Sequence, residues 1–145
     1  MTMQDEPKDG AMFGTVRNAL QNLPYVKMLG FDATCEDAAL RGQLPFAEHL
    51  IGNPLVPALH GGVIAALLHF TAAAQLMMEM RSGKIPQIFT CTIEYLASPE
   101  LRDCQASADI VSQTRRFANI RATAWQPHSG KMIATATMQF LTRAE

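Results

Sequence analysis

The segment from Gly61 to Met78 contains 18 consecutive residues without a charged side chain. It is too long for one strand and well suited to a helix. Its two apolar stripes consist of Val63, Leu67, Phe70, Ala74 and Met77 on one side and Leu68, Ala72, Leu76 and Met80 on another. Because apolar residues cover nearly the whole circumference, other elements must enclose this helix. We expect a buried core helix over residues 61–81 and not a membrane span, since His69, Thr71 and Gln75 make the segment only moderately apolar.

Most of the remaining chain has apolar residues at every second position, which predicts half-buried strands. The expected strands cover residues 31–36, 39–44, 89–95, 101–111, 117–126 and 132–140. This alternation indicates an antiparallel sheet with one buried face, and the absence of β-α-β repeats excludes a doubly wound parallel sheet. Helical spacing over residues 11–23 predicts a short outer helix. We therefore expect a flexible arm over residues 1–10 and one α+β domain over 11–145, a meander of about six strands curled around one long central helix.

The composition excludes several classes of function. Hydrophobic residues make up 48% of the chain and charged residues 17%, which is too apolar for a disordered segment. A net charge of −1 without a basic block argues against nucleic-acid binding. Cys35, Cys91 and Cys104 form no C-x-x-C pair, so we expect no disulfide framework, no metal site and no cofactor. The polar, acidic N-terminus differs from a signal peptide, which favours a cytoplasmic protein.

A proline-stiffened loop leads into the central helix through His60, Gly61 and Gly62. The start of a helix carries unpaired backbone N–H groups and a partial positive charge. These groups are suited to binding an oxyanion or a polarised carbonyl, and glycine allows a ligand to approach the backbone closely. The sequence therefore predicts a ligand site at this corner, to which Gly62 contributes as a substrate-binding residue.

The order of elements, together with Asn53 and the run His60-Gly61-Gly62, resembles the hotdog-fold acyl-CoA thioesterases, and within them the PaaI-type (phenylacetate-pathway) family. Residues 114–119 and 130–136 are similar to the last two strands of that family. The resemblance covers about residues 25–141. It implies a hotdog fold, an obligate homodimer or homotetramer whose sheets join edge to edge, active sites at the subunit interface, and no metal.

The resemblance also implies roles for individual residues. Gly61 would donate its backbone N–H to the thioester carbonyl, while Asn53 and His60 would position the acyl group or the water. The family places an acid on the helix, nine residues after the motif histidine, reaching across from the other subunit. Here that position is His69, and no carboxylate occurs between Gly61 and Met78. Either a neutral His69 acts as general base, or catalysis is weakened and the fold binds acyl-CoA or another small ligand.

Further candidates have two interpretations each. Arg115, Arg116 and Lys131 suit the phosphates of coenzyme A, or they are solvated residues at the sheet edge. Thr90 and Thr92 are candidates for contacts to the acyl group or water, or they are ordinary exposed strand threonines.

A second resemblance concerns residues 49–57, which are similar to the loop of hotdog 3-hydroxyacyl dehydratases. In that family the histidine, here His49, is the catalytic base. The family's acid on the following helix is absent, because Val63 occupies its position. The dehydratase is the less favoured alternative.

Overall fold

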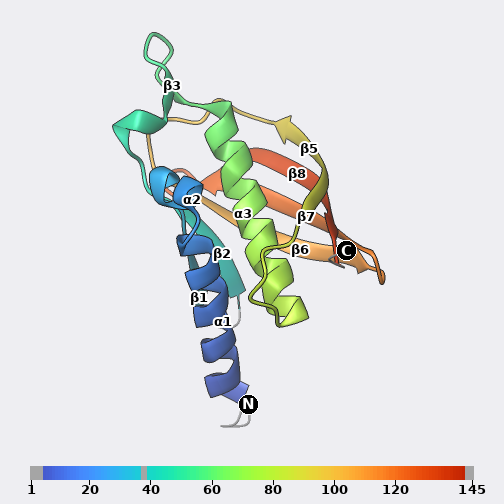
Figure 1. Ribbon diagram of the computed structural model, residues 1–145. Coiled ribbons are helices and arrows are strands. Elements are labelled where there is room, and N and C mark those ends of the chain that lie inside the picture. Colours follow the sequence, from blue (N-terminus) through green and yellow to red (C-terminus); the bar gives the residue numbers. More distant parts are fainter. Residues whose placement is uncertain (1–4, 37–38, 143–145) are drawn as a thin grey trace.

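The computed structural model of the chain describes residues 5–36 and 39–142 (Figure 1). Helix α3 (Gly61–Met80) runs along one face of a six-stranded antiparallel sheet that curls around it. The sheet consists of β1 (Asp32–Glu36), β2 (Ala39–Leu44), β5 (Ile88–Tyr95), β6 (Cys104–Gln113), β7 (Phe117–Gln126) and β8 (Lys131–Leu141). The remaining elements are α1 (Asp5–Gln21), α2 (Pro24–Leu29), the 3-10 turn η1 (Glu48–Leu50), and the small hairpin of β3 (Ile51–Asn53) and β4 (Ala58–Leu59). This architecture confirms the expected hotdog fold.

The strands follow the order β1-β2-β6-β7-β8-β5. The expected count of six is confirmed, but the sheet is not a simple meander, because β5 lies at the far edge beside β8 and β2 pairs with β6. Two rows of alanines cross the inner face of β6, β7 and β8, and all six are buried: Ala106, Ala124 and Ala134 in one row, and Ala108, Ala122 and Ala136 in the other. Such short side chains leave room for a helix to lie close to the sheet.

Helix α3 approaches β2 even more closely. A methyl group built onto Gly42 of β2 would overlap the hydroxyl of Thr71, which is buried and donates to the Leu67 carbonyl at 2.7 Å. The hydroxyl is thus satisfied inside the helix, as a buried polar group requires. By length and composition α3 could cross a membrane, but most of it is buried inside the molecule, as in the core helix of a globular domain.

Several boundaries differ from expectation. Helix α1 begins at Asp5, so residues 5–10 are helical and not a loose arm, whereas residues 1–4 lie outside the described part. Residues 37–38, between the first two expected strands, also lie outside the described part. Strand β6 begins at Cys104 and not at Leu101. The segment before it is bound by the buried Gln126, whose carboxamide accepts from Glu100 N–H at 3.0 Å and donates to the Glu100 carbonyl at 2.8 Å.

Strand β5 departs most clearly from its sequence pattern. The alternation of Phe89, Cys91, Ile93 and Tyr95 predicts one buried face, yet nearly the whole strand is exposed. Phe89 is 61% exposed and Tyr95 53%. The reason is its position: β5 pairs only with β8 and forms the edge of the sheet.

Candidate active site

His60 forms the N-cap of α3. Its Nδ1 accepts the Gly62 N–H at 2.8 Å, and its own backbone N–H donates to the Leu50 carbonyl at 2.9 Å. Because Nδ1 is an acceptor, the neutral ring carries its proton on Nε2. The residue is exposed, so this N–H can donate to a ligand. A histidine in place of the usual Ser, Thr, Asp or Asn therefore caps the helix and presents a donor at the same time.

The backbone N–H of Gly61 is the free donor of this corner. The Val63 and Ile64 N–H groups donate to the His60 carbonyl, at 3.0 and 3.4 Å, and that of Gly62 is taken by the His60 ring. Among the described residues, no acceptor is found for the Gly61 N–H. It lies at the positive end of a 20-residue helix. The Gly61 N–H, which the resemblance implies as the oxyanion donor, is thus without an acceptor in the described part of the chain.

Two residues that sequence reasoning did not single out support the corner. The Tyr95 hydroxyl at the end of β5 donates to the Gly61 carbonyl at 2.8 Å, which fixes the orientation of the first peptide of α3. Gly52 in β3 lies against the next strand, and a methyl group there would come within 2.8 Å of the His60 Cα. A tyrosine at the end of an alternating strand is a usable signal, because its hydroxyl needs a partner. The Gly52 contact depends on the register of the β3–β4 hairpin, which the sequence pattern does not indicate.

His69 does not join this corner within one chain. It follows Gly61 by eight residues, which corresponds to about 12 Å along the helix axis. Its ring stacks on Phe70, with centroids 4.9 Å apart, and on Phe140 of β8 at 5.8 Å. Burial lowers the pKa of the His69 imidazole from its ordinary value of 6.5, because removal from water disfavours the charged ring. Burial therefore favours the neutral form of His69.

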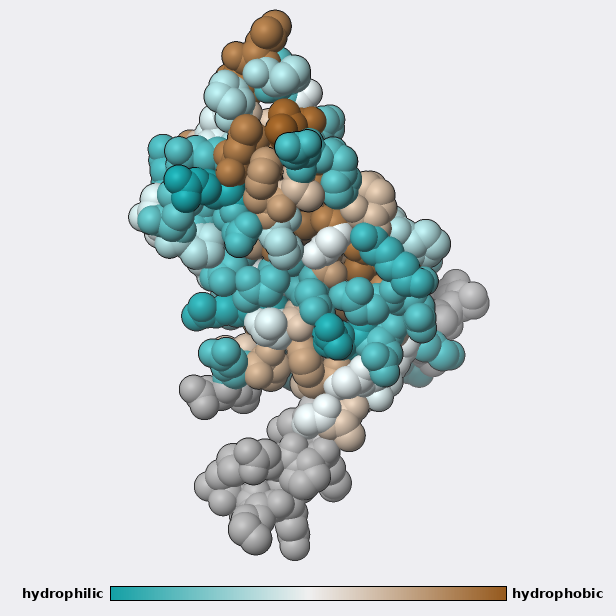
Figure 2. Space-filling view, turned by 90° about the vertical axis from the view of Figure 1, so that its left-hand side faces the viewer, coloured by the Kyte–Doolittle hydropathy of each residue, from teal (hydrophilic) through white to brown (hydrophobic). Residues whose placement is uncertain are grey.

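Asn53 lies at the end of β3, on the tip of the β3–β4 hairpin. Its carboxamide oxygen accepts the Leu55 N–H at 3.0 Å, which is the turn-capping contact of an Asx-turn. Leu55 and Val56 in the same tip are 90% and 59% exposed. Figure 2 shows hydrophobic atoms at this projecting end of the molecule. The turn thus uses the Asn53 oxygen, and the residue is exposed.

The expected coenzyme A contacts separate into two groups. Lys131 begins β8 at the end of the sheet where Tyr95 and Gly61 meet, since Tyr95 pairs with Ala134. Arg115 and Arg116 lie in the β6–β7 loop near the opposite, C-terminal end of α3. Thr90 and Thr92 are exposed on β5, and Thr90 donates to the Gln139 side chain at 3.3 Å. One chain therefore does not gather these residues around a single ligand.

A cavity also lies at the C-terminal end of α3, and not at the corner. Its volume is about 600 Å³, and its walls come from the end of α3, the segment that follows it, and the facing ends of β7 and β8. Neither His60, Gly61 nor His69 lines it. The corner at the start of α3 is an exposed surface in the single chain.

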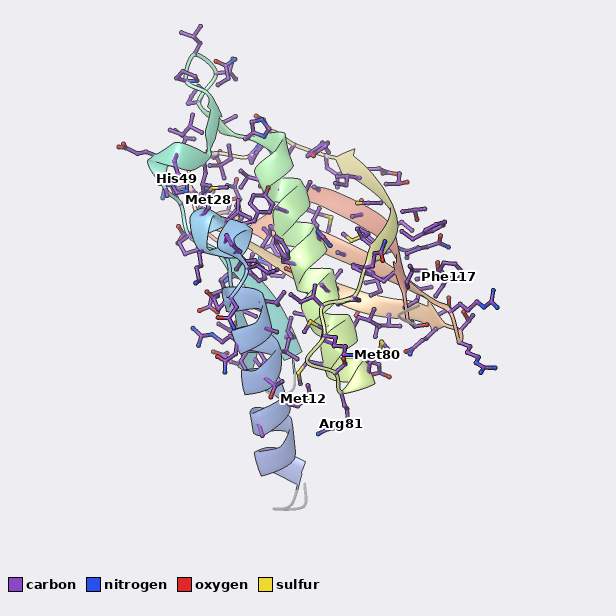
Figure 3. The ribbon with its side chains drawn as sticks, in the orientation of Figure 1. Met12, Met28, His49, Met80, Arg81 and Phe117 are labelled. Carbon is purple, nitrogen blue, oxygen red and sulfur yellow. The ribbon has the colours of Figure 1, made fainter. Side chains whose placement is uncertain are left out.

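His49 in η1 is held by an interaction of its own. Its Nε2 lies 2.6 Å from the Met28 carbonyl, which can only accept, so Nε2 is the protonated nitrogen (Figure 3). This hydrogen bond links η1 to α2, which favours a structural role for His49 over that of a free catalytic base. Within the described residues, no cluster of three or more His, Cys, Asp or Glu side chains is arranged to hold a metal ion.

Comparison with known proteins identifies the family of this chain. The family model of the acyl-CoA thioesterase N-terminal domain matches residues 53–141, which include the corner, α3 and the last four strands. A comparison with curated proteins finds no match.

Solved structures share the fold. A protein from Shewanella oneidensis related to the thioesterase superfamily has 21% identity and a TM-score of 0.79, covering 94% of this chain and 99% of its own. A phenylacetic acid degradation-related protein from Ralstonia eutropha has 18% identity and a TM-score of 0.75, covering 90% and 99%. A Bacillus halodurans protein solved with CoA has 18% identity and a TM-score of 0.74, covering 100% and 98%. With the family model matching more than half of its length, this chain belongs to the acyl-CoA thioesterase family.

Proposed function

We propose that the protein hydrolyses acyl-CoA thioesters by a PaaI-like mechanism. The observation that carries this proposal is the free Gly61 N–H at the positive end of α3, beside the exposed Nε2–H of His60. A thioester carbonyl placed there would accept from Gly61, and its carbon would become more electrophilic. One oxyanion donor of this kind contributes on the order of 100- to 1000-fold in rate. Asn53 and His60 position the acyl group or the attacking water.

The reaction needs a base as well as a donor. A water molecule adds to the carbonyl carbon while His69 accepts its proton, and the negative charge develops on the oxygen bound by Gly61. The carbon–sulfur bond then breaks, and the sulfur takes the proton from His69 and leaves as the thiol of coenzyme A, while a carboxylic acid remains. Because His69 lies about 12 Å along α3 from Gly61 of its own chain, we assign the base to the α3 of a second subunit.

A homodimer, or a homotetramer built from it, follows from this assignment. Strand β5 is an edge of the sheet, and its outer side carries unpaired backbone groups that another strand can bind. Two β5 strands joined edge to edge would bring two α3 helices to the same face of one sheet. In such an assembly, Thr90, Thr92 and Arg115 of one subunit and Lys131 of the other are the proposed contacts to acyl-CoA, while Arg116 lines a separate cavity at the end of α3.

A second candidate is an acyl-CoA-binding protein without appreciable turnover. The supporting observation is that α3 carries no carboxylate before Glu79, while the His69 ring is stacked and partly buried. An imidazole is a weaker substitute for the family's acid, since it cannot act as a carboxylate nucleophile. A dehydratase based on His49 is less well supported, because its Nε2 is bound to Met28.

A panel of acyl-CoA thioesters assayed by thiol release separates the two candidates. For the enzyme we expect turnover of at least one thioester and a loss of about tenfold or more in kcat/KM for His60→Ala. Tyr95→Phe keeps the ring but removes the hydroxyl bond to Gly61, so we expect a smaller loss. Binding of CoA esters without turnover on any member of the panel would exclude the enzyme.

The role of His69 is tested by the pH profile. We expect the rate to fall in acid with an apparent pKa below 6.5, because burial lowers the pKa of this group. His69→Ala should abolish this fall in rate at acid pH. His69→Asp should raise the rate if the rest of the site follows the family's chemistry. An unchanged acid limb in His69→Ala would remove His69 from the mechanism.

A further inference from the structure

The cavity at the C-terminal end of α3 has an apolar interior. Its volume of about 600 Å³ falls within the range of roughly 300–1,000 Å³ that small-molecule sites occupy. The interior is formed by Leu76, Met77, Met80, Ile85, Pro86, Phe117 and Leu141. Unbranched methionine side chains adapt to flexible ligands, and the Phe117 ring in the wall lies against Phe89, with ring centroids 5.4 Å apart. An aliphatic chain suits this interior better than a polar ligand.

The rim of the same cavity is basic. Lys84 and Arg116 line it from opposite segments, and no acidic residue is among the lining residues. Both are exposed, and neither takes part in an ion pair with another described residue. Figure 3 shows Met80 at the end of α3, with Phe117 on β7 across from it. The cavity therefore combines an apolar interior with two cationic groups that are available to an anion.

The helix dipole acts against an anion here, since the C-terminal end of α3 is its negative end. Two of its last four carbonyls accept from the chain itself, because Ser82 N–H donates to Met77 at 3.0 Å and Arg81 N–H to Met78 at 3.2 Å. These two carbonyls are thus less available to a ligand's donors, and Lys84 and Arg116 favour an anionic head group.

We propose that this cavity binds a fatty carboxylate, with the aliphatic tail inside and the carboxylate at Lys84 and Arg116. The site is distinct from the corner at the start of α3 and does not depend on the proposed hydrolysis. A free carboxylate is also the product class of that reaction, so occupancy would report its accumulation.

Binding of saturated fatty acids to the full-length protein, measured by calorimetry below their micelle concentrations, tests the proposal. From octanoate to dodecanoate we expect roughly fourfold tighter binding for each added methylene until the cavity is filled. Dodecanol, which lacks the charge, and dodecyltrimethylammonium, which reverses it, should bind more weakly than dodecanoate.

The variants identify the position. Lys84→Gln and Arg116→Gln should each weaken dodecanoate binding about three- to tenfold. Arg115→Gln is the matched control, because Arg115 is the neighbour of Arg116 but does not line the cavity. Equal affinity in all three variants, or equal binding of dodecanol, would overturn the proposal. Competition by coenzyme A without an acyl group would also overturn it, since the cavity would then belong to the thioester site.

Discussion

At the scale of single residues, the corner depends on how closely backbones approach. Gly52 lies in β3 and His60 directly follows β4, the other strand of the same small hairpin, and their separation leaves no room for a side chain on Gly52. His60 in turn binds Gly62 and carries the backbone that places the Gly61 N–H. The geometry of the oxyanion donor is thus set by a glycine that has no chemistry of its own.

Gly52→Ala should therefore damage the corner. The new methyl group would lie 2.8 Å from the His60 Cα, so backbone must shift. We expect a loss of about 1–3 kcal/mol in the free energy of unfolding, measured in urea, and a larger relative loss in thioesterase rate. Gly14→Ala in α1 is the control, since nothing lies within 4 Å of its added methyl. It should stabilise the helix by up to about 1 kcal/mol. Wild-type activity and stability in Gly52→Ala would contradict this reading of the hairpin.

His69 should make stability depend on pH. Its pKa is lowered in the folded state, so the unfolded chain binds the proton more readily and stability rises with pH in that window. The full contribution is present above the ordinary pKa of 6.5 and is lost as the pH falls toward the folded value. Urea unfolding of wild type and His69→Gln between pH 5 and 8 measures this, and the dependence should be smaller in the variant. Parallel curves for the two proteins would count against a buried neutral imidazole.

At the scale of elements, α3 crosses β2 at a contact that leaves no room for a side chain on Gly42. Gly42→Ala would push against Thr71 and against the ring of Phe31, which a built methyl would approach to 3.0 Å. We expect a destabilisation of roughly 1–3 kcal/mol. The double variant Gly42→Ala/Thr71→Ala removes part of the overlap. Its destabilisation should therefore be smaller than the sum of the two single destabilisations. Strict additivity in urea unfolding would show that the two residues do not share this contact.

The sequence predicted elements well where local pattern decides them. The uncharged run predicted α3 to within one residue of its observed end, because a helix that is apolar on all sides must be buried. The sequence pattern failed where contacts with distant parts of the chain determine the start or the exposure of an element. The start of β6 depends on Gln126, which is distant in sequence, and the exposure of β5 depends on sheet order. Asn53, His60 and Gly61 were recognised from their motif, whereas Tyr95 and Gly52 act through contacts that periodicity does not report.

At the scale of the whole molecule, the single chain holds only part of the proposed site. The donor at Gly61 and the base at His69 lie on one rigid helix and cannot meet each other. A sheet edge at β5 offers the means of supplying the missing half. The proposed catalytic residues can thus be named from the sequence, whereas the assembly that would bring them together is part of the proposal.

Disruption of this edge should affect size and activity together. Cys91→Lys places a charge on the exposed edge strand β5. We expect a shift from dimer or tetramer toward monomer in sedimentation, with a parallel loss of thioesterase rate. Thr34→Lys on β1, the opposite edge of the sheet, is the control and should change neither. A monomer that retains full activity would refute the shared site.

The order of the strands also governs how the chain can be synthesised and folded. β5 has no partner in the sheet except β8, which is translated only after β6 and β7. Until β8 emerges from the ribosome, β5 cannot be fixed and the apolar α3 remains incompletely covered. Late pairing between distant segments slows folding and exposes aggregation-prone surface. Nascent chains arrested before Lys131 should be cleaved rapidly by protease and bound by chaperones, and extension through Leu141 should confer protection.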